Sequence, residues 1–185
     1  MLDDIIYIGG QIFGIAPIVF GFISFQAKSS RGIIFWQLAT ALSFSLHYLM
    51  IGAITGMALN LVAALKGITY YFRNKKGSKE LFTPIFFTVL AIFTSILTWQ
   101  AWYSLFLLTG LIINTLSFAL LSPQKVRVCM LAKAPITIVY NVFVFSIAGI
   151  VYESIIFISA IIGLIRLSKK HANSQRTYDM SSSND

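Results

Sequence analysis

The chain has little charge, few acidic residues and almost no cysteine. Only 11% of its 185 residues are charged, six of them are Asp or Glu, and Cys129 is the single cysteine. Because about a quarter of the residues in a soluble domain are charged, this composition excludes most water-soluble folds. One cysteine also excludes a disulfide framework or a cysteine metal site within the chain.

The few histidines and the clustered glycines do not form an enzyme signature. His47 and His171 are separated by long apolar runs, so they cannot make a paired metal site. Gly9, Gly10 and Gly14 lie inside an apolar run without a preceding strand, which excludes a phosphate-binding loop. The GxxxG spacing of Gly10 and Gly14 instead predicts close helix packing. We expect a protein that is not an enzyme and that holds no metal and no cofactor.

Apolar residues are abundant, at 57% of the chain, and the net charge is +8. The basic residues punctuate apolar runs instead of forming a patch on a soluble surface, which argues against binding to nucleic acid. A helix that spans a bilayer needs about 20 apolar residues. The sequence therefore predicts an all-α integral membrane protein, surrounded by lipid bilayer, with seven transmembrane helices near residues 5–25, 33–51, 53–71, 81–99, 102–121, 128–146 and 150–167.

The positions of lysine and arginine support this count of seven. Apart from Lys66 and Lys133, the basic residues fall into four groups, within residues 28–31, 73–79, 125–127 and 166–176, and each group follows an odd-numbered span. With the N-terminus outside and the C-terminus cytoplasmic, every group lies on the cytoplasmic side, as the positive-inside rule requires. Joining any two neighbouring spans would break this pattern.

The first three and last three spans share landmarks that indicate an internal repeat. At similar spacing after a basic pair, we match His47, Gly52, Gly56 and Arg73 with Asn141, Ser146, Gly149 and Arg166. Because one span separates the triplets, they enter the membrane from the same side, as two parallel three-helix repeats plus a linker helix. The domains are residues 1–73 as the first repeat, 74–100 as a basic cytoplasmic loop and linker helix, 101–167 as the second repeat, and 168–185 as a disordered cytoplasmic tail.

Scattered polar and glycine positions over nearly the whole chain carry a resemblance to a known family. They are FQAK at residues 25–28, HYLMIG at residues 47–52 and, further on, Lys66, Tyr140, Asn141, residues 146–149, Glu153, Ile165 and Arg166. In these the chain resembles the YgjV-type family of bacterial inner-membrane proteins. The resemblance implies the bacterial cytoplasmic (inner) membrane as the location and carries no particular activity with it.

More remotely, the layout is similar to SWEET sugar facilitators, PnuC-type vitamin transporters and PQ-loop proteins, which have three-span repeats. The chain departs from these families in two ways. It has a single Pro-Gln pair, at residues 123–124, and the prolines of its repeat spans are Pro17 and Pro135. Sugar facilitators place hinge prolines in four core helices, so the resemblance does not imply sugar transport by the same hinge.

Polar side chains inside the spans are the candidate functional residues, because a polar group removed from water needs a partner. Gln11, His47, Asn60, Asn114 and Asn141 come from both triplets. We interpret them as the lining of a lumen for a small polar solute, since amides both donate and accept hydrogen bonds. Hydrogen bonding between helices is the alternative interpretation, and it stays open.

Three ionisable residues extend this interpretation. His47, whose imidazole ordinarily titrates near pH 6.5, suggests proton coupling, with Glu153 as its partner on the same side of the membrane. Lys66 and Lys133 lie near the cytoplasmic ends of their spans. They are expected to snorkel to the headgroups, and the alternative is that they attract an anionic solute.

The leading functional hypothesis is a transporter or facilitator that moves a small polar solute between the repeats. The alternative is a non-transporting membrane receptor or assembly partner that uses its basic tail to dock a cytoplasmic protein. The GxxxG step is compatible with a homo-oligomer, but it does not require one.

Overall fold

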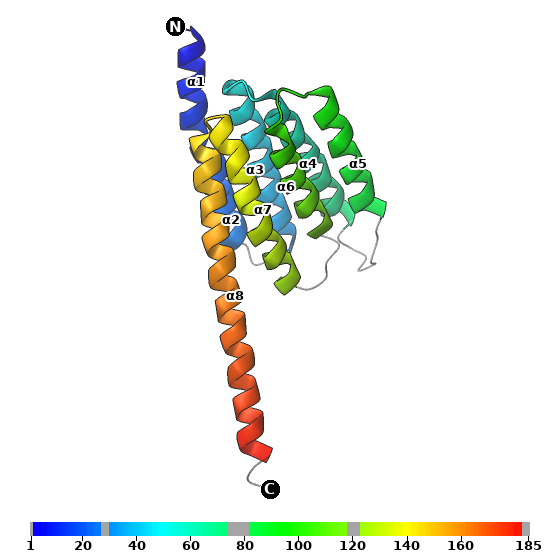
Figure 1. Ribbon diagram of the computed structural model, residues 1–185, viewed down its shortest axis with the longest axis vertical. Helices are drawn as coiled ribbons and strands as arrows, with labels where there is room; N and C mark the ends of the chain where they lie inside the picture. The colour runs from blue at the N-terminus through cyan, green and yellow to red at the C-terminus, as the bar shows by residue number, and fades with distance from the viewer. Residues whose placement is uncertain (1, 27–29, 74–81, 118–122, 183–185) are drawn as a thin grey trace.

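The computed structural model describes residues 2–26, 30–73, 82–117 and 123–182, and within them the secondary structure is entirely helical (Figure 1). The helices are α1 (Leu2–Phe13), α2 (Ile15–Gln26), α3 (Ser30–Met50), α4 (Ile54–Arg73), α5 (Phe82–Leu97), α6 (Ser104–Ser117), α7 (Pro123–Phe143) and α8 (Ile147–Ser182). The basic residues at positions 28, 75, 76 and 79 lie outside the described residues.

The first predicted span is divided into α1 and α2 at Gly14. Pro17 is buried just after this point, and a proline both lacks a backbone donor and crowds the carbonyl four residues earlier. Gly14 N still donates to Gly10 O over 3.0 Å, so the chain continues in nearly the same direction. One interrupted span is thus made from two short helices.

Three pairs of neighbouring predicted spans are separated by only a few uncharged residues, so hydropathy alone could have read each pair as one helix. The structure interrupts the helix at all three of these joints. The chain leaves helical structure between α3 and α4, between α5 and α6, and between α7 and α8. The first two breaks lie where the sequence predicts them, and the third lies a few residues before the predicted 147–149. Charge placement therefore divided the apolar runs correctly at these joints.

The α3–α4 and α7–α8 hairpins have the same backbone hydrogen-bond pattern. In the first, Ala53 N donates to Tyr48 O over 2.8 Å; in the second, Ser146 N donates to Asn141 O over 2.9 Å. The residue before each donor is left-handed, with φ of 77° at Gly52 and 53° at Phe145. Both turns are Schellman motifs, in which these bonds satisfy the last carbonyls of a helix.

The shared pattern corrects two of the four predicted matches by one residue. Positions 93 residues apart correspond, so that Tyr48 matches Asn141 and Gly52 matches Phe145. The predictions that His47 matches Asn141 and that Gly52 matches Ser146 were wrong, whereas the other two predicted pairs, Gly56 with Gly149 and Arg73 with Arg166, already have this spacing.

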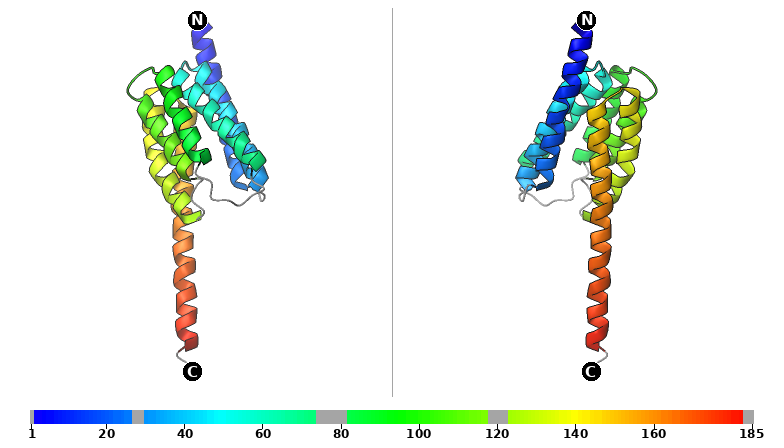
Figure 2. Two further views of the ribbon diagram at one scale, coloured as in Figure 1. Left: turned by 90° about the vertical axis from the view of Figure 1, so that its right-hand side faces the viewer. Right: turned by 90° about the vertical axis from the view of Figure 1, so that its left-hand side faces the viewer.

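Six helices form a closed ring, with each one packed against the next in the order α2, α3, α4, α6, α7, α8 and back to α2. The seams of the ring match, because α2 contacts α8 as α6 contacts α4. Helix α5 packs outside the ring against α4 and α6. Figure 2 shows the α2–α3–α4 side and the α6–α7–α8 side meeting near the hairpins and diverging toward the opposite end.

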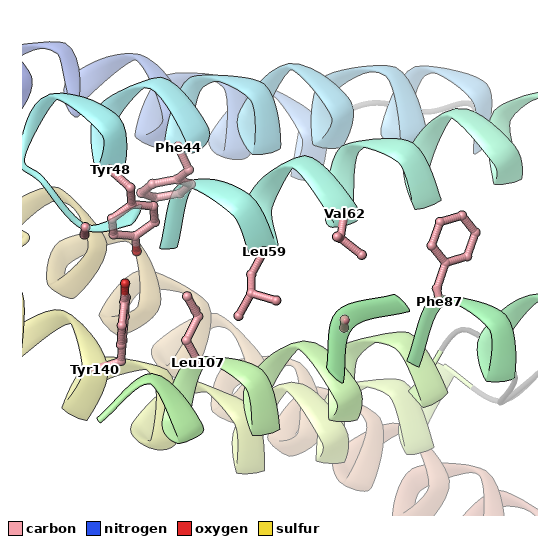
Figure 3. Packing of buried hydrophobic residues seen from close by; sticks show 9 residues of the cluster. Phe44, Tyr48, Leu59, Val62, Phe87, Leu107 and Tyr140 are labelled. Atoms are coloured by element: carbon pink, nitrogen blue, oxygen red, sulfur yellow. The ribbon is translucent and has the colours of Figure 1, made fainter. Parts of the chain in front are cut away.

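Polar side chains gather inside the bundle and apolar ones cover its outside. A core cluster crosses between the two sides, with Phe44, Leu59 and Val62 facing Leu107 and Phe87 (Figure 3). Exposed large apolar side chains run along the whole outer face of the bundle, for example Phe22, Leu65, Phe93, Leu105 and Ile162. This is the reverse of the distribution in a water-soluble protein, where large exposed apolar surfaces are uncommon.

Two stretches are long and apolar enough to cross a bilayer by length and composition, Asp4–Ser24 and Ile147–Ile165. Shorter apolar helices occupy Phe82–Leu97, Ser104–Ser117 and Val128–Phe143. Seven spans therefore stay a prediction. Helix α8 continues to Ser182, through most of the residues predicted as the tail, and projects from the bundle (Figure 1). Neither glycine nor proline occurs after Gly163, so nothing in the backbone chemistry ends the helix where the composition turns polar.

Candidate functional site

A cavity of about 170 Å³ lies inside the ring. Its walls come from α3 and α4 on one side and from α6, α7 and α8 on the other. Three of the predicted lumen residues, Asn60, Asn114 and Asn141, line it, and so does Glu153. These amides and the carboxylate therefore converge from four different helices, whereas Gln11 and His47, which were also expected in the lumen, do not line it.

The lining repeats across the two sides of the ring. Many lining residues have a counterpart 93 positions later that also lines the cavity: Gln37 and Met130, Thr40 and Lys133, Phe44 and Thr137, Tyr48 and Asn141, Leu59 and Tyr152, Asn60 and Glu153, and Ala63 and Ile156. The cavity is thus enclosed by matching faces of α3 with α4 and of α7 with α8.

The end of the cavity nearest the hairpins is sealed. Tyr48 is 3% exposed and donates from its hydroxyl to Asn141 Oδ1 over 2.6 Å. Asn141 Nδ2 donates to Thr137 O over 3.0 Å, and the ring of Phe44 stacks on that of Tyr48 with centroids 5.7 Å apart. Tyr140, fully buried beside Tyr48, completes this aromatic closure (Figure 3).

The other end of the cavity is more open. Its lining includes Ile34 and Gln37 near the start of α3, Tyr70 near the end of α4 and Met130 in the first half of α7. Each of these side chains is partly exposed, whereas Tyr48 and Asn141 are buried. The cavity therefore opens away from the hairpins, toward the end where the two sides of the ring diverge (Figure 2).

His47 lies beside the seal, completely buried, and is not part of the lining. Its Nδ1 is 2.8 Å from Gly10 O, and its Nε2 is 2.8 Å from Ser146 Oγ. Because a carbonyl only accepts, Nδ1 carries the proton and donates. Ser146 Oγ in turn accepts from Gly149 N over 3.0 Å, as an N-cap of α8 does. The imidazole therefore links α1 to the second hairpin.

Gln11 also serves the second hairpin and does not line the cavity. Its Nε2 donates to Phe145 O over 2.6 Å, and its Oε1 accepts from Ile147 N over 3.3 Å. Gln100, which the sequence analysis did not single out, does the same at the first hairpin: Nε2 donates to Gly52 O over 2.9 Å and Oε1 accepts from Thr55 N over 3.1 Å. Each left-handed turn is thus held by one glutamine from another helix or connection.

The lysines inside the bundle turn toward the cavity. Lys66 is 4% exposed, and its Nζ donates to Asn114 Oδ1 over 2.7 Å and to Thr115 Oγ1 over 3.3 Å. Lys133 Nζ forms an ion pair with Glu153 Oε1 at 2.7 Å. The snorkelling prediction was therefore wrong for both. Glu153 pairs with Lys133, and the ring nitrogens of His47 contact Gly10 and Ser146, so the proton-coupling pair stays a prediction without a direct contact.

The close helix packing predicted for Gly10 and Gly14 is confirmed. A Cβ at Gly10 would lie 2.8 Å from Met50 Cβ, and one at Gly14 would collide with Ala148 Cβ on α8. Within the described part of the chain, no three His, Cys, Asp or Glu side chains gather closely enough to hold a metal ion. The absence of a metal or cofactor remains a prediction.

Comparison with known proteins gives a match to a family model. A family model described as bacterial inner membrane protein matches residues 8–171, which include the whole cavity lining. Neither a curated protein nor a solved structure matches the chain.

Proposed function

Because the chain belongs to the Imp-YgjV family of bacterial inner membrane proteins, we propose that it crosses that membrane seven times and moves a small polar solute through its central cavity. The first span is α1 together with α2, and the remaining six are α3 to α8. The apolar exterior of the bundle supports immersion in lipid, where buried polar groups and an apolar surface are the stable arrangement.

The N-terminus lies outside and the C-terminus in the cytoplasm in this proposal. Odd-numbered spans then run inward, and the four basic groups follow them on the cytoplasmic side, as the positive-inside rule requires. The hairpins face outward. The sealed end of the cavity is therefore the outer end, and the open end faces the cytoplasm.

The transport unit is built from two parallel three-helix repeats, α2 with α3 and α4, and α6 with α7 and α8, joined by α5. The matching hairpin bonds, the matching seams of the ring and the paired lining all support this arrangement. In parallel-repeat transporters the two units rock against one another around a site between them. Here the rocking would part the outer seal and close the cytoplasmic end.

The observation that carries the proposal is the cavity itself, which has amide and ionisable side chains among its apolar lining and is bounded by corresponding residues of both repeats. A protein whose interhelical amides served only to join helices would have no need of a space that opens to one side. The volume of 170 Å³ is below the roughly 300–1,000 Å³ of sites for drug-sized ligands. The solute is therefore small.

Uptake into liposomes tests the proposal. We expect the purified protein to give saturable uptake of one or more members of a panel of small sugars, polyols, amino acids and organic acids. Ala63→Phe, which fills the cavity, should abolish this uptake. Leu65→Phe, on the outer face of the same helix, should leave it unchanged. Absence of saturable uptake across the panel, or uptake unaffected by Ala63→Phe, would contradict transport.

A second candidate function rests on α8. The helix is 36 residues long, about 54 Å at 1.5 Å per residue, and its polar half extends beyond the bundle. This rigid basic extension suits docking of a cytoplasmic protein. A receptor without transport activity would give no flux, and its co-purifying partner would be lost when residues 168–185 are deleted.

A further inference from the structure

The cavity contains more positive than negative charge. Among the described residues that line it, the ionised side chains are Lys66, Lys133 and Glu153. Two ammonium groups and one carboxylate leave a formal excess of one positive charge. Ionisable residues at membrane depth are rare and mark the paths of ions or solutes, so this excess requires an explanation beyond helix packing.

Each lysine side chain has polar partners inside the bundle. Lys66 reaches across the α4–α6 seam to the oxygens of Asn114 and Thr115, both of which are neutral acceptors. Lys133 reaches from α7 to Glu153 on α8, and its side chain stays 16% exposed. An ammonium group has three donors, and the ion pair uses one of those of Lys133.

Lys66 on α4 and Lys133 on α7 line the same cavity from its two sides. Two positive charges beside one enclosed space repel one another when the cavity is empty. An anion bound between them is attracted to both. Glu153 offsets part of the charge beside Lys133. The arrangement is therefore suited to a ligand with a single anionic group.

The charges of the cavity are not repeated between its two halves. The backbone arrangement is duplicated: each half has the same left-handed turn and the same contact between repeats. In each half, a glutamine side chain from outside the hairpin also bonds the turn. By contrast, Glu153 corresponds to Asn60, Lys133 to Thr40 and Lys66 to Ser159. If these charges only joined the repeats, both repeats would need them. Because each charged residue has an uncharged counterpart in the other repeat, the cavity is electrostatically asymmetric. It therefore favours one orientation of an asymmetric solute.

We propose that the cavity binds a small solute with one carboxylate or phosphate group, whose oxygens contact the ammonium groups of Lys66 and Lys133. The proposal rests on the proposed function, because it names the class of solute that the cavity carries. The amide of Asn60, which lines the cavity and is partly exposed, then faces the uncharged part of the solute, where it can bond hydroxyl groups.

The experiment compares three probes that share a three-carbon skeleton: glycerol, glycerate and glycerol 3-phosphate. Binding to the purified full-length protein is measured directly, and uptake of each is measured in liposomes. We expect saturable binding of glycerate, glycerol 3-phosphate or both, and much weaker binding of glycerol. Whichever anion binds more tightly identifies the preferred group.

Variants separate a specific site from general attraction. Lys66→Gln should weaken anion binding at least about tenfold, because a hydrogen bond to a charged group is lost, and Lys66→Arg should retain it. Should Lys66→Gln fail to fold, the double variant Lys133→Gln/Glu153→Gln removes the second ammonium group without leaving its carboxylate alone. It should also weaken anion binding.

Three results would overturn the anion site: glycerol bound as tightly as the anions, no binding of either anion, or folded lysine variants that bind them as the natural protein does. Failure of transport is a different result. Anion binding without uptake would remove the transport proposal and leave the site, whereas saturable uptake of neutral solutes with no anion binding would remove the site and leave transport.

Discussion

Tyr48 donates a hydrogen bond to Oδ1 of Asn141 over 2.6 Å, and the two residues stand at the same position of hairpins that are 93 residues apart. The bond therefore joins corresponding points of the two halves at the sealed end of the cavity. If the halves move apart at this end, it is among the first contacts to break. Its strength helps to set how often the seal opens.

Tyr48→Phe should make the sealed end open more often. The variant keeps the ring that stacks on Phe44 and loses a hydrogen bond worth about 0.6–1.5 kcal/mol, which is roughly a threefold to tenfold change in an equilibrium. A cysteine at Ala63 in a Cys129→Ala background reports on access to the cavity. We expect faster labelling by a membrane-impermeant reagent from the hairpin side.

Two controls belong to that measurement. Phe44→Leu alters the aromatic packing without touching the hydrogen bond, and a cysteine at the exposed Leu65 reports on reagent activity alone. Equal labelling of Ala63→Cys with and without Tyr48→Phe would show that the bond does not hold the seal.

Gln11 and Gln100, whose side chains bond the two hairpin turns, should stabilise the hairpins without affecting binding in the cavity. Gln100→Leu removes two bonds to the first turn, and Gln11→Leu removes two from the second. Gln100 is exposed and Gln11 is half-buried, so each variant should cost about 0.5–1.5 kcal/mol and lower Tm by a few degrees. Gln37→Leu, in the cavity lining, is the matched control and should change solute binding more than Tm. Unchanged Tm in both Gln100→Leu and Gln11→Leu would contradict this role.

The two left-handed turn residues should respond in opposite directions to substitution. Gly52 has φ of 77° and open space around it, so Gly52→Ala is penalised by backbone conformation alone, at about 1 kcal/mol. Phe145 has the same conformation with φ of 53°, and its side chain is exposed. Phe145→Gly should therefore raise stability, by up to about 1 kcal/mol. Thermal unfolding in detergent measures both, and a shift of the same sign would contradict the strain at Phe145.

Phe145 also explains where sequence reasoning lost the register of the repeat. A left-handed turn residue is usually glycine, and Gly52 fits that expectation. In the second half the position is taken by phenylalanine, which gives no signal in a sequence. The nearest small residue, Ser146, was matched in its place, although its role is to cap α8.

The position of a residue along its helix could be predicted from sequence, but its direction around the helix axis could not. Asn60, Asn114 and Asn141 line the cavity as expected. Gln11 and His47 lie at similar depth and face the second hairpin instead. Counting residues from the end of a span gives height. The direction in which a side chain faces depends on which helices pack against its own helix. That packing is set by tertiary contacts, such as the close contact of Gly14 with Ala148 on α8.

The lysines were misplaced for a related reason. Snorkelling was expected because the side chains are long enough to reach the cytoplasmic interface. Lys66 instead meets Asn114 and Thr115, partners on a different helix whose proximity no local pattern reveals. Polar residues in neighbouring spans are a signal only once the order of helices around the ring is known.

Ser146→Ala should be more destabilising than its size suggests. The hydroxyl caps α8 through Gly149 N and also contacts His47 Nε2. Loss of an N-cap costs about 1 kcal/mol, and a buried imidazole nitrogen without a partner adds about 1–3 kcal/mol. Ser154→Ala on the same helix loses only a bond to Ile150 O in its own helix and serves as the control. Equal unfolding temperatures for the two variants would show that the His47 contact adds nothing.

The Lys133–Glu153 pair should behave as a unit. Changing one partner leaves a buried charge without its counterpart, which costs about 3–5 kcal/mol, whereas removing both together costs much less. Lys133→Gln and Glu153→Gln should therefore each lower stability more than the double variant does, in a double-mutant cycle on unfolding free energy. The remaining oxygen of Glu153, Oε2, is buried and has no hydrogen-bond partner, which makes the isolated carboxylate of Lys133→Gln the more costly single change. Additive effects of the two substitutions would show that the charges act separately, and the pair would then not offset charge within the cavity.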